Sequence, residues 1–162
     1  MNGADSRASA RVSGGPTAEP TTRPIDPRGP RFGAAISTVV LAAVVLLGTS
    51  RAGLVVLGVA VALFAIGAVR GAQGSLQGMA FRRWVQPRLA PPAHLEDPRP
   101  PRFAQTVGLV VTATGLALAL IGVPIAAPAA AAVALVAAFL NAAFGFCLGC
   151  EIYLLLRRLR AS

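Results

Sequence analysis

The chain has few charged residues, no lysine and only two cysteines. Charged side chains make up 13% of its 162 residues and apolar side chains 55%, and the mean hydropathy is +0.67. A soluble core of this length cannot bury so much apolar surface without leaving large patches in contact with water. The composition therefore excludes an ordinary soluble globular protein and indicates a membrane protein.

Because lysine is absent, all fifteen strongly basic residues are arginine, and the formal net charge is +9. Proteins that bind nucleic acids gather their basic residues into one stripe with aromatic side chains between them. In this chain the arginines instead flank apolar runs. We therefore expect no nucleic-acid partner, and we expect the arginines to contact the anionic headgroups of a lipid bilayer.

Four apolar runs each contain about 17 to 21 residues, close to the roughly 20 that a helix needs to cross a bilayer. They cover residues 32–48, 52–69, 103–123 and 129–148. The predicted fold is an all-α integral membrane protein whose four transmembrane helices form two tight hairpins. Residues 1–25 are rich in Gly, Pro, Ser and Thr, which predicts a disordered cytoplasmic tail.

The loop between the second and third runs predicts a short helix that lies in the membrane interface. In "SLQGMAFRRWVQPRL" one helical face carries Leu76, Met79, Ala80 and Trp84, and the arginines lie elsewhere. An apolar face of this kind, with basic residues beside it, is typical of a helix parallel to the membrane surface.

An internal repeat organises the chain. "DPRGPRF" at residues 26–32 recurs as "DPRPPRF" at residues 97–103, and "FRRWV" from Phe81 matches "LRRLR" from Leu156 at a spacing of 75. The repeat predicts two parallel units, residues 26–96 and 97–162, related by a pseudo-twofold axis along the membrane normal. We interpret the DPR motifs as interface anchors, with Asp26 and Asp97 pairing with nearby arginines or capping the helix that follows.

Both cysteines, Cys147 and Cys150, form a CxxC in "FGFCLGCEIY" at the end of the fourth apolar run. On a continuous helix they share one face and lie within disulfide range. The negative end of a helix and the neighbouring Glu151 would disfavour a thiolate there, unless the helix breaks at Gly145 or Gly149. At the spacing of 75, Ala72 and Ser75 of the first unit align with Cys147 and Cys150. Cys147 and Cys150 are the candidate catalytic residues.

The only histidine, His94, lies near Glu96 and Asp97 in the middle loop. Such a trio could supply metal ligands or acid–base groups, but a solvated loop explains it as well, and we prefer that interpretation.

"DPRGPRF", "RLAPPAHLEDPRPPRFAQ" and "AAFLNAAFGFCLGCEIYLL" resemble a family of small four-helix bacterial membrane proteins that is catalogued as a domain of unknown function. The resemblance covers residues 25–158 and brings no established activity. It implies a thioredoxin-like or sulfurtransferase protein as a partner, since such proteins are often encoded nearby.

Three functions remain open. The first is thiol–disulfide or sulfur chemistry at Cys147 and Cys150, facing a soluble partner at the inner membrane surface. The second is metal binding, with the cysteines supplying half of a tetrahedral site and His94, Glu151 or a second chain the rest. The third is a scaffold in which the cysteines only pack. We favour the first; the sequence identifies no substrate, cofactor or oligomeric state.

A transporter is a weaker hypothesis, because the predicted spans contain few polar side chains. They include Gln105, Thr106, Thr112, Thr114 and Asn141, of which Asn141 is expected to form a hydrogen bond between helices.

The distribution of arginine predicts that both chain termini and the middle loop lie in the cytoplasm. Fourteen of the fifteen arginines flank the spans on one side, and the two hairpin turns contain only Arg51. In a plasma membrane protein, loops rich in Lys and Arg remain on the cytoplasmic side of the membrane. A reporter that is active only in the cytoplasm should therefore be active when it is fused after residue 162, and a reporter that is active only in the periplasm should not. Activity of a periplasm-specific reporter at this position would contradict the predicted topology.

Overall fold

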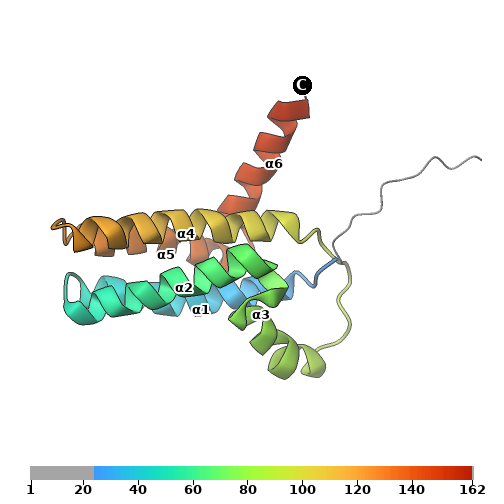
Figure 1. The fold of residues 1–162 in the computed structure, drawn as a ribbon. Coiled ribbons are helices and arrows are strands. Elements are labelled where there is room, and N and C mark those ends of the chain that lie inside the picture. Colours follow the sequence, from blue (N-terminus) through green and yellow to red (C-terminus); the bar gives the residue numbers. More distant parts are fainter. Residues whose placement is uncertain (1–23, 162) are drawn as a thin grey trace, which may run out of the picture.

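Four long helices form the body of the protein, of which the computed structural model describes residues 24–161. They are α1 (Arg28–Leu47), α2 (Arg51–Gly74), α4 (Arg99–Leu120) and α5 (Ala126–Phe144). All four are long and apolar enough to cross a membrane, and Figure 1 shows them side by side with both hairpin turns at one end. The predicted all-α membrane fold is therefore confirmed. Residues 1–23 of the predicted tail lie outside the described residues.

Two further helices, here called the lateral helices, turn away from the bundle axis at the other end (Figure 1). The first is α3 (Leu76–Ala80), which continues through a π-helical turn (Phe81–Val85) and a 3-10 turn (Gln86–Arg88). It is the short helix expected in the middle loop, and Leu76, Met79 and Trp84 are exposed, as a lipid-facing surface requires. The second is α6 (Leu148–Ala161).

The fourth transmembrane helix ends earlier than predicted. The apolar run continues to Leu148, but α5 stops at Phe144, and the predicted basic tail is the helix α6. Gly145 ends α5 because it adopts a left-handed conformation, with φ 70°, and its N–H donates to the carbonyl of Asn141 at 3.0 Å. Glycine has no Cβ to oppose a positive φ, so helices commonly stop in this way. Hydropathy alone does not detect such a stop.

The main helix contacts run between the two hairpins. α1 packs most extensively against α5, and α2 against α4. Leu41, Val44 and Leu57 lie fully buried at the centre. Small residues bring α4 and α5 together, because a Cβ at Gly115 would overlap the side chain of Ala130. Close packing of small residues is a main source of attraction between helices in a membrane.

Both DPR motifs begin a transmembrane helix in the same way. The Asp26 carboxylate accepts a hydrogen bond from the Arg28 backbone N–H at 3.0 Å, and the Asp97 carboxylate accepts one from the Arg99 N–H at 2.9 Å. Each aspartate therefore bonds the first backbone N–H of the helix that follows, although the N-cap residues themselves, Pro27 and Pro98, make no side-chain cap. Asp26 also forms an ion pair with the Arg28 guanidinium, at 2.8 Å.

The last arginine of each motif reaches the end of a helix from the other hairpin. Arg102 on α4 donates to the carbonyls of Ala68 and Val69 on α2, at 2.8 and 3.1 Å. These residues lie just before Gly71, where a φ of 77° interrupts the helical conformation of α2. Arg31 on α1 donates to the carbonyl of Ala142 on α5, at 3.5 Å. Carbonyls near a helix C-terminus lack backbone partners and carry partial negative charge, so a guanidinium stabilises them. These two arginines have partners within the protein, and headgroup contact remains a prediction.

The lateral helices start alike, but at a register that the sequence match misses. The Ser75 carbonyl accepts from the Met79 N–H at 2.9 Å, and the Cys147 carbonyl accepts from the Glu151 N–H at 3.0 Å. Each bond opens its helix, so Cys147 is the counterpart of Ser75 and the offset between the units is 72. The predicted offset of 75, which paired Cys150 with Ser75, is therefore wrong, and Cys150 corresponds to Gly78.

Aromatic contacts support the offset of 72. The ring of Phe32 in the first DPR motif lies 5.8 Å from that of Phe81, measured between centroids. The ring of Phe103 in the second motif lies 5.6 Å from that of Tyr153. Phe81 and Tyr153 are separated by the same offset, so each lateral helix meets the DPR motif of its own hairpin at the same point.

The segment before α1 is fixed to the middle loop. The backbones of Ile25 and Glu96 exchange two hydrogen bonds of 2.9 Å, and Ile25 is only 1% exposed. The Arg28 guanidinium donates to the carbonyl of Ala90 at 2.9 Å. Ile25, which the sequence assigns to the tail, therefore belongs to the packed structure.

The aspartates of the two DPR motifs should respond differently to substitution. Hydrogen bonds from the Arg28 side chain lower the pKa of Asp26, so its contribution to stability is complete above the ordinary aspartate pKa and is lost as the pH falls through the lowered value. We expect Asp26→Asn to lower the thermal unfolding midpoint in detergent by several degrees at pH 7, with the loss vanishing in strong acid. Asp97→Asn, which alters the same bond at the start of a helix without an ion pair, is the matched control. Equal losses for both variants would contradict this prediction.

Candidate functional site

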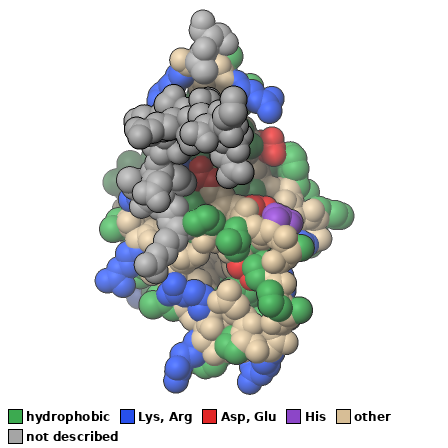
Figure 2. All heavy atoms as spheres, turned by 90° about the vertical axis from the view of Figure 1, so that its right-hand side faces the viewer, with side chains coloured by type: hydrophobic (Ala, Val, Ile, Leu, Met, Phe, Trp, Pro, Cys, Tyr) green, Lys and Arg blue, Asp and Glu red, His purple; other side chains and the backbone are tan. Residues whose placement is uncertain are grey.

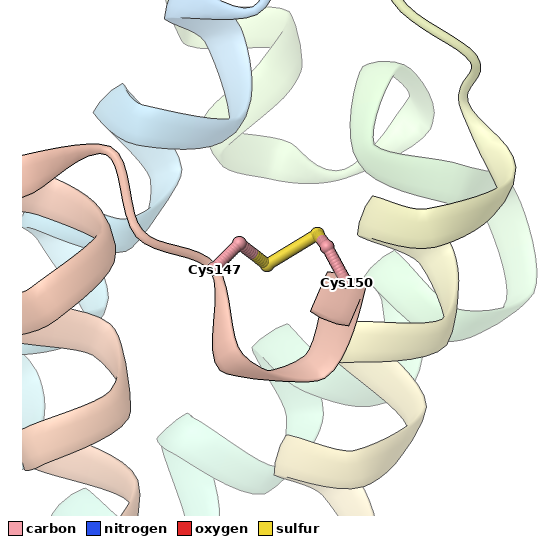
Figure 3. The surroundings of a disulfide bond; sticks show 2 residues. All are labelled: Cys147 and Cys150. Carbon is pink, nitrogen blue, oxygen red and sulfur yellow. A yellow bond between two sulfur atoms is a disulfide. The ribbon is translucent and has the colours of Figure 1, made fainter. Parts of the chain in front are cut away.

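The two cysteines lie where the chain turns from α5 into α6. Figure 3 shows Cys147 in the connecting turn and Cys150 in the first turn of α6, with their sulfur atoms joined. The pair forms a disulfide with a Cα–Cα distance of 5.2 Å, within the usual range. Of the two arrangements that the sequence leaves open, a continuous helix and a helix broken at Gly145 or Gly149, the structure therefore has the break at Gly145.

This placement changes the electrostatics of the pair. The amide end of a helix, unlike its carbonyl end, stabilises a thiolate. Glu151 in the same turn opposes that effect, whereas the Arg31 guanidinium supports it. A Cβ built on Gly145 would lie 3.5 Å from the Arg31 Cζ atom, so this cation lies against the turn that precedes Cys147.

A cavity of about 910 Å³ with both charged and apolar lining residues opens beside the disulfide, and we call it the outer cavity. It lies at the end of the bundle that bears both DPR motifs, and Figure 2 shows acidic, histidine and arginine side chains gathered on this end. Its charged or sulfur-containing side chains are Arg28, Arg31, His94, Glu96, Asp97, Cys147, Cys150 and Glu151. The structure therefore brings the His94 trio and the CxxC to one space, although the whole of the second hairpin separates them in the sequence.

The trio is both solvated and part of the cavity. The side chains of His94 and Glu96 are 69% and 49% exposed, and His94 Nε2 lies 3.6 Å from Glu96 Oε1. The loop is solvated, as expected, but the sequence did not show that these side chains also line the cavity beside the cysteines. No spacing rule reveals the proximity, because it depends on the backbone pairing of Ile25 with Glu96 and on the Arg28 contact with Ala90.

A second cavity, of about 510 Å³, lies on the other side of Cys147, and we call it the inner cavity. Its lining is mostly apolar and comes from α1, α2, α4, α5 and the start of α6. Cys147 lines both cavities, whereas Cys150 lines only the outer one. Cys147 is therefore a residue that the charged outer cavity and the mostly apolar inner cavity share.

The equivalent place in the first hairpin is almost filled. A cavity there, lined by Asp26, Ala72, Gly78 and Phe81, measures only about 30 Å³. Asp26 corresponds to Asp97, and Gly78 corresponds to Cys150. The large cavity and the two cysteines thus occur together in the second hairpin.

The ligand set considered for a metal is not assembled. Among residues 24–161, no three His, Cys, Asp or Glu side chains come together in a way that could hold a metal ion. His94 and Glu151 therefore do not complete a site with Cys147 and Cys150. A metal shared with a second chain remains a prediction.

The position of Arg31 predicts a difference between the two DPR motifs. Arg31 lines the outer cavity, whereas its counterpart Arg102 does not. After reduction of the disulfide, Arg31→Gln should slow alkylation of the thiols by anionic iodoacetate several-fold more than alkylation by neutral iodoacetamide. Arg102→Gln is the matched control and should leave that ratio unchanged. If both variants changed the ratio equally, Arg31 would have no specific influence on the thiols.

Comparison with known proteins identifies the family of the chain. A search of the curated proteins finds no match, and a search of the solved structures finds no match. The family model that matches is described as a domain of unknown function, DUF4395, and it covers residues 25–158. The match begins at the buried Ile25 and ends within α6, so it includes both DPR motifs, both cavities and the CxxC. The chain belongs to the DUF4395 family.

Proposed function

We propose that this membrane protein carries out thiol–disulfide exchange with a soluble dithiol protein through Cys147 and Cys150. The observation that carries the proposal is the disulfide itself, at the amide end of α6 and on the wall of the outer cavity. A scaffold would need neither cysteine at this position. The family description supplies no activity, so the argument depends on this geometry.

The exchange begins in the outer cavity. A thiolate of the partner attacks the sulfur of Cys150, which lines only that cavity, and the Cys147–Cys150 bond breaks with its electron pair on Cys147. The amide end of α6 and the Arg31 guanidinium stabilise the Cys147 thiolate. A second thiolate of the partner then attacks the mixed disulfide. The partner leaves as a disulfide, and this chain retains both thiols after taking up two protons.

His94 is the group in the outer cavity best suited to take the proton of the incoming thiol. Imidazole changes protonation near neutral pH, and His94 lines the same space as both sulfurs. Its large exposure leaves it accessible to a partner at the surface.

The partner is proposed to be a cytoplasmic thioredoxin-like or sulfurtransferase protein. The outer cavity opens at the end that bears the DPR motifs and the arginines of the middle loop, and that end is predicted to face the cytoplasm. Arginines of the lateral helices are proposed to hold this end against anionic headgroups. Because the cytoplasm is reducing, the resting state there would be the dithiol and the disulfide would be transient.

Single substitutions of the two cysteines test the exchange. Because the exchange is reversible, the Cys150 thiolate also attacks the disulfide of the oxidised partner, and the Cys147 thiolate then releases that partner. In Cys147→Ser this releasing thiolate is missing, so the partner should remain attached to Cys150. Non-reducing electrophoresis and mass spectrometry of membranes should therefore find a mixed disulfide at least several-fold more abundant than in Cys150→Ser. A mass increase of one sulfur atom on the cysteine would instead identify sulfur transfer.

The control for these variants is membrane abundance, which should change little because both side chains are partly exposed. If each variant lowered abundance as a packing defect does, and no mixed disulfide or added sulfur were found, the cysteines would be structural.

A further inference from the structure

The inner cavity is the feature of the molecule that thiol exchange with a soluble partner leaves unused. It has a volume of about 510 Å³, which is in the range of cavities that bind small organic molecules. Its lining includes Val133 and Val136 of α5, which are 63% and 57% exposed. α5 is one of the membrane-spanning helices, so the cavity opens sideways toward the hydrocarbon of the bilayer.

The two hairpins differ in the residues beside this cavity. In the first hairpin the Gln77 side chain donates to Ser37 Oγ at 3.3 Å. In the second hairpin Gly149 takes the place of Gln77, at the offset of the lateral helices, and Gly108 takes the place of Ser37, at the offset of the DPR motifs. Both glycines line the inner cavity, but neither has room for a side chain, because a Cβ at Gly108 would lie 2.7 Å from the Phe64 ring and a Cβ at Gly149 would lie 2.6 Å from Ala104. The glycines therefore allow close packing of helices at the edge of the cavity.

The cavity is apolar but contains a few polar groups. Ser37, Gln105 and Asn141 line it together with Cys147. Within the described residues, Gln105 Oε1 is buried and has no hydrogen-bond partner. An unpaired buried amide oxygen is costly. This oxygen lies against Gly67 of α2, where a Cβ would be 2.7 Å away, and it does not face the cavity. Ser37 and Asn141 are therefore the polar residues of the lining that a ligand can use.

We infer that the inner cavity binds the ring of a lipid-soluble quinone, which accepts electrons from the reduced cysteines at Cys147. This inference rests on the proposed thiol chemistry. A quinone has a flat apolar ring with two carbonyl acceptors, which become hydroxyl donors on reduction, and a tail that remains in the bilayer. These properties fit an apolar cavity with a few polar groups, an opening to lipid and a redox-active sulfur on its wall.

The reaction balances without another reagent. The Cys147 thiolate adds to a ring carbon of the quinone and forms an S–C bond. The Cys150 thiolate then attacks the Cys147 sulfur, so that the disulfide forms and the S–C bond breaks with its electron pair on the ring. The two protons of the thiols end on the two ring oxygens. One quinone becomes one hydroquinone, and one dithiol becomes one disulfide.

The two cysteines therefore have different partners. Cys150 lines only the outer cavity and receives the soluble protein, whereas Cys147 also lines the inner cavity and faces the quinone. Electrons would pass from the soluble dithiol protein through this disulfide into the membrane. A phospholipid acyl chain would also fit the apolar lining, but it accepts no electrons and leaves the polar groups without partners.

The test uses the full-length protein, reduced and reconstituted in liposomes without oxygen, with decylubiquinone as the probe. The quinone absorbance should fall by one equivalent per pair of thiols lost. Ala137→Leu, which places a larger side chain in the cavity, should slow this oxidation at least tenfold. Ala143→Leu is the matched control, because Ala143 lies on the same helix, is exposed and lines neither cavity. It should react like the unmodified protein.

A second measurement covers the case in which Ala137→Leu does not fold. A photoreactive quinone should label residues of α4 and α5 that line the inner cavity in the unmodified protein. If quinone oxidised no thiols while a soluble dithiol protein still reduced the disulfide, this inference would be wrong and the proposed exchange would stand. If neither reaction occurred, both would be wrong. Labelling of the cavity by a photoreactive fatty acid, without oxidation by quinone, would assign it to a lipid chain.

Discussion

The last arginine of each DPR motif holds the end of a helix from the other hairpin, and the position of the candidate site depends on this contact. Arg102 bonds carbonyls just before the break at Gly71 in α2, and Arg31 reaches the final turn of α5. Backbone carbonyls that point out of a helix end are costly in a membrane unless a donor meets them. The arginines therefore help to determine where each helix stops. The CxxC begins shortly after the stop at Gly145, so Arg31 also sets its environment.

The two hairpins are built almost alike, so the few differences between them are informative. The aspartate bonds of the DPR motifs, the first bond of each lateral helix and the aromatic contacts all recur from one hairpin to the other at nearly constant offsets. Against that background, glycine replaces Gln77 and Ser37, and Cys150 replaces Gly78. The two glycines allow close packing beside the inner cavity, and the third change adds a thiol to the lining of the outer one. These differences are the reason that the proposals concern the second hairpin.

Much of the fold could be predicted from the sequence because hydropathy and arginine distribution report directly on the membrane. The four spans, the short helix of the middle loop and the place of Asp26 and Asp97 at the start of a helix were all accessible in this way. The end of α5 was not, because Gly145 acts through its backbone conformation while the residues on both sides remain apolar. Because the end of α5 was placed too late, α6 was not predicted, and the CxxC was placed at the carbonyl end of one helix, not at the amide end of the next.

The site itself depended on contacts that no local pattern contains. His94 approaches the cysteines because Ile25 pairs with Glu96, a contact that spans the whole first hairpin. The sequence identified Cys147 and Cys150 as a pair but could not show that Cys147 lines both cavities. That arrangement gives a physical reason for building the CxxC on a membrane bundle. A dithiol on a soluble domain meets only partners that dissolve in water, whereas Cys147, between α5 and α6, lines both a cavity with charged groups and a mostly apolar cavity among the membrane-spanning helices.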